Sequence, residues 1–186
     1  DAVGRDLFSR VVYGARQSLL GALIAVAVGL VLGTLIGLIA GTQRGWVDTV
    51  LMRLVDVLLA IPGILLSLSI IIVTGFGSLQ AAFAVGMTSV ATFARLARSQ
   101  VIQVAGADFV EAAYGSGATQ TQVLLRHVLP NSLTSVLALA ALQFGTAILQ
   151  LSILGFLGYG APPPTPEWGL LLSLIHISEP TRLRRI

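Results

Sequence analysis

Long apolar runs separated by short polar stretches dominate the chain. The first run without a formal charge covers residues 17–43, and the second covers residues 57–94. Because about 20 apolar residues in a helix cross the hydrocarbon core of a bilayer, the first run fits one membrane span and the second fits two. A Thr-Gly-Phe-Gly-Ser stretch at 74–78 interrupts the second run, which predicts a helical hairpin there. The apolar run 133–156 predicts a fourth span.

This pattern predicts an all-α membrane protein, a polytopic helical bundle. The most extensive polar segment of the chain separates the third and fourth predicted spans, and a stretch rich in glycine and proline follows the fourth. We expect spans at about 17–41, 54–74, 79–97 and 133–157, within a membrane domain covering 17–172. We expect the remaining parts to be a pre-helix segment on the outer face at 1–16, a cytoplasmic loop at 99–131 and an outer loop at 158–168.

Composition also indicates a bilayer environment. The 186 residues are 55% hydrophobic and 10% charged, with a mean hydropathy of +0.92, which leaves too little polar surface to cover a water-soluble globule. The net charge of +3 comes from arginines scattered between apolar runs, without the basic stripe of a nucleic-acid-binding surface. The sequence has no lysine, which excludes a P-loop lysine and Schiff-base catalysis. No nucleotide site and no enzymatic activity are expected in this chain.

Two features of the apolar runs predict how the helices pack. Gly29, Gly33, Gly37 and Gly41 recur every four residues, which places them on one helix face that another helix backbone can approach closely. Pro62 lies inside the second predicted span, where its missing N–H and its ring predict a kink or a break. The functional alternatives are a glycine-lined pore face and a gate at the proline. Packing is favoured because both residue types are common in membrane helices without such roles.

The arginines predict the orientation in the membrane. Positively charged connections tend to stay in the cytoplasm. The two connections that carry arginine, between the first and second spans and between the third and fourth, are therefore expected to be cytoplasmic. The arginines of residues 1–16 fall on the outer face under this assignment, so they depart from the rule. The arginines that flank the two connections are Arg44, Arg53, Arg95, Arg98 and Arg126.

The polar segment 99–131 has the most specific pattern. It contains the sequence DFVEAAYGSGATQTQVLLRHVLPN, with helix formers on both sides of a glycine-containing turn. This predicts a helix-turn-helix at the membrane surface. The small side chains of Ala112 and Ala113 allow the first helix to lie close in the groove of a partner, and Gly117 allows the chain to reverse. Pro130 is expected to end the second helix.

The order of these residues resembles the EAA loop, the signature of permeases in binding-protein-dependent, ATP-driven importers. In that family the loop docks on the ATPase subunit and transmits nucleotide-driven motion to the membrane helices. The resemblance thus implies that the segment couples this chain to an ATPase. It implies this role for Asp108, Phe109, Glu111, Ala112, Ala113, Gly117 and Pro130.

Three further segments, 4–19, 45–62 and 152–169, resemble the second permease of dipeptide, oligopeptide and nickel importers. The resemblance implies the type I, MetI-like permease fold and a channel-forming subunit in the plasma membrane of a bacterium or archaeon, importing peptides or nickel. The implied partners are a second homologous permease, two ATP-binding subunits, an extracytoplasmic solute-binding protein and membrane lipid. ATP and magnesium would be used by the ATP-binding subunits, and no cofactor or metal is expected in this chain.

The chain departs from the family pattern at both ends. The family's first membrane helix would lie upstream of residue 4, and the residues after 172 are short, polar and basic, unlike the family's last span. We therefore expect a fragment that is incomplete at both ends, with 173–186 as a truncated or non-native tail.

Other candidate chemistry is sparse. His127 has no second ligand near it in the sequence, which favours packing over zinc binding. Arg53 and Asp56, three residues apart, are placed to form an ion pair on one helix face. Every carboxylate lies at the end of a span or in a loop, which argues against a proton-coupled secondary transporter. A channel or a non-transporting membrane scaffold would also fit the apolar runs, and the EAA-like loop is the feature that argues against the scaffold. The substrate-contacting residues are unassigned.

Overall fold

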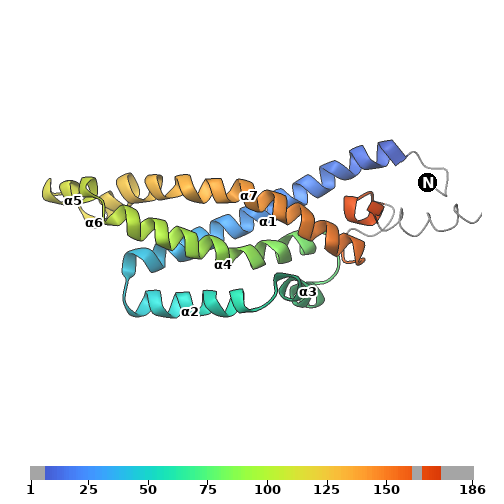
Figure 1. Cartoon of the computed structure of the whole chain (residues 1–186), viewed down its shortest axis with the longest axis horizontal. Helices are drawn as coiled ribbons and strands as arrows, with labels where there is room; N and C mark the ends of the chain where they lie inside the picture. The colour runs from blue at the N-terminus through green and yellow to red at the C-terminus, as the bar shows by residue number, and fades with distance from the viewer. Residues whose placement is uncertain (1–6, 161–164, 173–186) are drawn as a thin grey trace, which may run out of the picture.

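The computed structural model describes residues 7–160 and 165–172, and all regular secondary structure in these residues is helical. Three long helices run alongside one another, a fourth packs on their outside, and short elements lie at one end of this bundle (Figure 1). The long helices are α1 (Leu7–Gln43), α4 (Ser78–Ala105) and α7 (Leu129–Phe156). The outer layer is α2 (Trp46–Ala60) with α3 (Gly63–Thr74), and the short elements are α5 (Asp108–Gly115), α6 (Gln120–Val123) and the π-helical turn η1 (Leu124–Val128).

Small side chains hold the long helices close together. The largest buried cluster is rich in alanine from α1 and α4, and Phe93 is its largest fully buried side chain. Because lipid tails are as apolar as the side chains, membrane helices associate mainly through close van der Waals packing, which small residues permit. Among the described residues, three helices are long and apolar enough to span a membrane, and the bent pair of α2 and α3 would make a fourth span.

The first helix is longer than the predicted span at 17–41. It begins at Leu7, so the described part of the expected pre-helix segment is helical, and residues 1–6 lie outside the described residues. Arginine is a good helix former whose long stem lies along apolar surface, which explains why the arginines here do not interrupt the helix. The segment 165–172 packs against this part of α1, where Trp168 Nε1 donates a hydrogen bond to the Val11 carbonyl oxygen at 3.1 Å.

Pro62 divides the predicted span at 54–74 into two helices. α2 ends at Ala60, and α3 begins at Gly63 with its axis turned by 96°. Ile61 is extended, with φ −89° and ψ 128°, as expected for a residue before proline. Pro62 lacks the N–H that would continue the helix. The kink or break predicted at Pro62 is therefore present as a break, and the helix before it begins at Trp46, upstream of the expected start near residue 54.

The segment 99–131, which was expected to be a loop, is largely helical. Its first residues continue α4 to Ala105, and its last residues belong to one continuous helical stretch from Gln120 to Phe156. Pro130 therefore does not end a helix, contrary to the expectation. The preceding turn is π-helical, with the Leu129 N–H bonded to the Leu124 carbonyl. Widening the turn relieves the clash between a proline ring and the carbonyl four residues earlier. The predicted tail 173–186 lies outside the described residues.

Candidate coupling surface and membrane cavity

The short helix α5 is anchored at the end of the bundle by one buried side chain. Val110 is 1% exposed and packs in a cluster with Val101 of α4, Val123 of α6 and Val128 of η1. Ala113, one turn later, packs against the same cluster. Two residues separate α5 from the end of α4. This anchoring makes α5 part of the same packed unit as the helices on either side of it.

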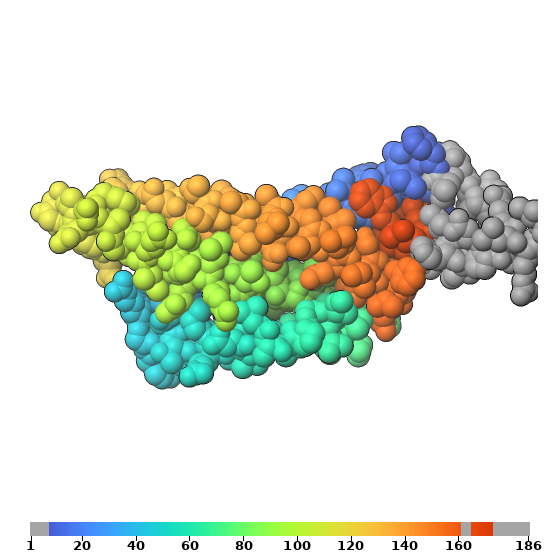
Figure 2. Space-filling model, viewed as in Figure 1, coloured from blue at the N-terminus to red at the C-terminus, as the bar shows by residue number. Residues whose placement is uncertain are grey.

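The opposite side of α5 is open to solvent and forms the tip of the molecule (Figure 2). Asp108, Phe109, Glu111 and Ala112 are all exposed, and Phe109 keeps 47% of its surface accessible. The Phe109 ring lies 6.4 Å from the ring of His127, measured between centroids. The two carboxylates stand in the first turn of α5, where the helix dipole favours negative charge. We call the exposed face of α5 the coupling surface.

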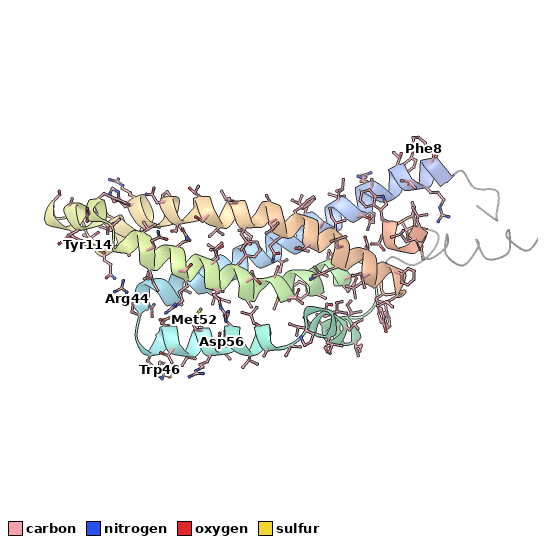
Figure 3. All side chains as sticks on the ribbon, in the orientation of Figure 1. Phe8, Arg44, Trp46, Met52, Asp56 and Tyr114 are labelled. Carbon is pink, nitrogen blue, oxygen red and sulfur yellow. The ribbon has the colours of Figure 1, made fainter. Side chains whose placement is uncertain are left out.

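A residue with a left-handed backbone conformation reverses the chain after α5. Gly117 has φ 87°, a conformation that glycine adopts without strain. Its N–H bonds to the Tyr114 carbonyl at 2.9 Å, and the N–H of Ala118 bonds to the Ala113 carbonyl at 3.1 Å, which together make a Schellman motif. The glycine-containing turn of the sequence is therefore present. Figure 3 places Tyr114 at this end of the molecule.

A capping box begins the helix after the turn. The Thr119 backbone N–H donates to Gln122 Oε1 at 3.0 Å, and the Gln122 N–H donates to Thr119 Oγ1 at 3.4 Å. The Thr-x-x-Gln spacing that signals this arrangement is readable in the sequence, although no prediction was made from it. Pro130 lies beyond η1, in the first turn of α7, so it shapes the backbone path to the coupling surface and is not on α5 itself.

The four spaced glycines of α1 face α4. A Cβ atom built on Gly33 would lie 2.5 Å from the Val90 carbonyl oxygen, and one built on Gly37 would lie 2.5 Å from the Ala94 carbonyl oxygen. Gly41 would meet Val101 in the same way, at 2.7 Å, and Gly29 would overlap the Ser89 hydroxyl. A side chain at Gly33 or Gly37 would push the two backbones apart, and one at Gly29 or Gly41 would displace a side chain of α4.

Two ion pairs join α2 to α4. Asp48 accepts two hydrogen bonds from the Arg98 guanidinium, at 2.5 and 2.6 Å. Asp56 accepts one from Arg95 at 2.6 Å, and Figure 3 shows Asp56 on the side of α2 that faces α4. The expected pair between Arg53 and Asp56 is therefore wrong. The cross-helix partner was available because α2 packs along α4.

A cavity of about 370 Å³ opens where α2 breaks. We call it the membrane cavity. It lies between the break at Pro62, one face of α4 and one face of α7, and its lining contains amides and hydroxyls but no charged side chain. The cavity was not predicted from the sequence, although its α7 residues recur at spacings of three and four on one helix face. The polar lining residues are Thr88, Ser89, Thr92, Gln143, Thr146 and Gln150.

Comparison with known proteins places the chain among transporter subunits. The family described as binding-protein-dependent transport system inner membrane component matches residues 33–178. The chain is 44% identical over 173 residues to the glutathione transport system permease protein GsiD of Escherichia coli O157:H7, covering 93% of this chain and 57% of that protein. It is 45% identical over 172 residues to GsiD of Shigella dysenteriae serotype 1 (strain Sd197), with 92% and 57% covered. The chain thus spans little more than half the length of these relatives.

Two solved structures have a similar fold. One is an inward-facing conformation of the MetNI methionine ABC transporter, with a TM-score of 0.72 at 18% identity, covering 90% of this chain and 88% of that chain. The other is an amino acid ABC transporter with histidines, with a TM-score of 0.70 at 19% identity, covering 94% and 84%. The predicted all-α fold and the family resemblance are confirmed. This chain is a membrane protein of MetI-type fold that belongs to the family of inner membrane components of binding-protein-dependent transport systems.

Proposed function

We propose that this chain is the channel-forming permease subunit of an ATP-driven importer, and that the coupling surface docks on a separate ATPase subunit. The observation that carries the proposal is the construction of α5, which exposes Phe109 and Glu111 at the tip of the bundle while Val110 ties it to α4 and η1. A surface anchored in this way can receive force from outside and pass it to the membrane helices.

The proposed mechanism follows from how α5 is connected. Its buried valine touches the end of α4 on one side and the continuous stretch from α6 to α7 on the other. Closure of two ATPase subunits would move α5, and both long helices would move with it because packed clusters shift as units. Reorientation of α4 and α7 would then open a path for solute towards the cytoplasm.

The proposed assembly contains this chain, a second related permease, two ATP-binding subunits and an extracytoplasmic solute-binding protein, in the plasma membrane of a bacterium or archaeon. The ATP-binding subunits hold ATP and magnesium. Membership of a family named for binding-protein-dependent transport supports the solute-binding partner. The fold shared with two ABC transporters supports the ATPase partner.

We propose a short peptide as the solute. The relatives at 44–45% identity are named for transport of glutathione, a tripeptide, which favours a peptide over nickel. The membrane cavity contains amides and hydroxyls, whereas a site for a nickel ion would need imidazole, thiolate or carboxylate ligands.

Charge reversal at Glu111→Arg in the full-length permease tests the coupling assignment. We expect loss of ATPase-subunit association and of ATP-dependent uptake, because the change places a cation at the N-terminal turn of α5 and reverses the charge presented to the partner. Gln103→Arg, which puts the same charge on an exposed position of the last turn of α4, is the matched control and should retain both. Unchanged association and uptake in Glu111→Arg would contradict the assignment.

A further inference from the structure

Two of the six polar lining residues of the membrane cavity make no side-chain hydrogen bond within the described residues, and the others keep free acceptors or donors. Thr88 and Ser89 each donate their hydroxyl to a carbonyl of their own helix at 2.8 Å, which leaves the hydroxyl oxygens as acceptors. Among the described residues, Thr92 and the Gln150 amide have no side-chain hydrogen-bond partner, and both side chains are partly buried. Their polar atoms are not among the fully buried atoms without a partner, so water or a solute in the cavity can reach them and complete their hydrogen bonds.

The side-chain amides of the two glutamines offer hydrogen-bond donors and an acceptor to a solute. Gln143 uses its Oε1 to accept from Thr146 at 2.9 Å, which orients the amide and leaves its Nε2 as a donor. Gln150 lies two turns further along the same face of α7, with both its donor and its acceptor available. A primary amide pairs with a peptide group by donating to the carbonyl and accepting from the N–H.

We propose that the membrane cavity is a hydrated section of the solute path that binds uncharged hydrogen-bonding groups, such as the amide groups of a short peptide, through Gln143 and Gln150. The inference rests on the proposed transport function and names the residues and chemistry that its solute would meet. A volume of about 370 Å³ is at the small end of known ligand pockets. A charged side chain of a solute would find no counter-ion in this lining, so the lining favours uncharged groups.

Cysteine accessibility tests whether the cavity is hydrated in the assembled transporter. This chain contains no cysteine. Gln150→Cys and Leu149→Cys differ by one position on α7, and Leu149 is 65% exposed on the outside of the described bundle. A water-soluble maleimide should label Gln150→Cys faster by on the order of tenfold, because the reaction needs a thiolate and thiolates form in water. Equal labelling of the two variants would overturn the proposal.

Filling the cavity tests whether solute passes through it. A Cβ atom on Gly63 would have Gln150 Nε2 and Thr88 Cβ as its nearest neighbours, both at 3.9 Å, so Gly63→Ala fits without displacement. Gly63→Leu would occupy the cavity. With trialanine as the probe in proteoliposomes of the whole transporter, we expect Gly63→Leu to lose most uptake and Gly63→Ala to retain it. The comparison is made on purified complexes that retain the partner permease, and wild-type uptake in Gly63→Leu would overturn the proposal.

A charge introduced at Gln150 tests the ligand chemistry. Gln150→Glu should raise uptake of Ala-Lys-Ala relative to trialanine by on the order of tenfold, because it supplies the missing counter-charge. An unchanged ratio, or a wild-type transporter that moves neither peptide while hydrolysing ATP, would overturn the ligand class. Failure of the proposed function differs from these outcomes, because the wild-type chain would then associate with no ATPase subunit.

Discussion

The two ion pairs between α2 and α4 differ in how far water reaches them. In the Asp48 and Arg98 pair, the side chains are 16% and 33% exposed, and two hydrogen bonds join them. In the Asp56 and Arg95 pair, the side chains are 52% and 59% exposed, with one hydrogen bond. Water and salt screen exposed pairs strongly, and the geometry of a bidentate pair is better defined. The two pairs are therefore expected to differ in energy.

Replacing each acid by its amide measures this difference. Asp48→Asn should lower the free energy of unfolding by about 1.5–3 kcal/mol, because it weakens hydrogen bonds to a charged group that is partly shielded from water. Asp56→Asn should cost less than about 1 kcal/mol, as exposed pairs usually do. Thermal unfolding of the permease in detergent compares the two variants. Equal costs would show that burial does not set the strength of these pairs.

The glycine contacts give a second prediction for single residues. Gly33→Ala should destabilise the permease by about 1–3 kcal/mol, because its methyl group would overlap the α4 backbone and overpacking has this cost. Gly145→Ala is the matched control, since Gly145 is also helical and no atom lies within 4 Å of its added Cβ. The free energy of unfolding of this control should rise by up to about 1 kcal/mol, because alanine has a higher helix propensity than glycine. The same detergent unfolding measurement applies, and equal effects at both positions would contradict close packing at Gly33.

At the residue scale, the sequence predicted the contacts that follow from helix periodicity, and it did not predict those that depend on how separate helices pack. The spacing of the glycines predicted a shared face because helical periodicity follows from the backbone alone. Asp56 was assigned to Arg53 because sequence distance was the available guide, whereas its partner Arg95 is brought near by packing of α2 on α4. The membrane cavity was missed for the same reason, since its polar residues come from two helices, α4 and α7, that only packing brings together.

At the scale of elements, two prolines have different effects on their helices. Pro62 separates α2 from α3 with a 96° turn, whereas Pro130 is accommodated in a continuous helix by the π-helical turn before it. A proline removes one donor and crowds one carbonyl, which the sequence reveals. Whether the chain then breaks or widens depends on what packs around it. At Pro130 the buried Val123 and Val128 hold the helix on both ends of the turn.

The π-helical turn gives a prediction for Pro130→Ala. Without the proline ring, η1 can return to an α-helix, and one residue of changed register rotates the preceding segment by about 100° relative to α7. The coupling surface would then be misoriented while the membrane helices stay packed. We expect ATPase-subunit association in pull-down assays to fall with little change in thermal stability. Thr134→Ala, an exposed position on the same helix, should leave association unchanged. Full association in Pro130→Ala would mean that the π-helical turn does not position α5.

At the scale of the whole molecule, the ends of the bundle differ in charge and shape. The connection from α1 to α2, which contains Arg44, lies at the same end as α5 (Figure 3). Arg95 and Arg98 reach towards α2 from the half of α4 that leads to this end. Arg10 and Arg16 lie on the first turns of α1, at the opposite end. The positive-inside rule counts arginines in short loops near span ends, so the arginines at the two ends favour opposite orientations in the membrane.

We predict that the α5 end faces the cytoplasm, because more arginines lie at that end and the proposed ATPase partner would meet the coupling surface there. Ser116→Cys, exposed after α5, and Thr74→Cys, exposed at the end of α3, mark the two ends of the bundle. A membrane-impermeant maleimide should label Ser116→Cys in inverted vesicles and Thr74→Cys in right-side-out vesicles. The reverse pattern would place α5 outside, where no ATP is available to a docked ATPase, and would exclude the coupling proposal together with the orientation. Labelling of Ser116→Cys from the cytoplasmic side would instead place Arg10 and Arg16 of α1 at the outer end of the bundle, as a local departure from the positive-inside rule.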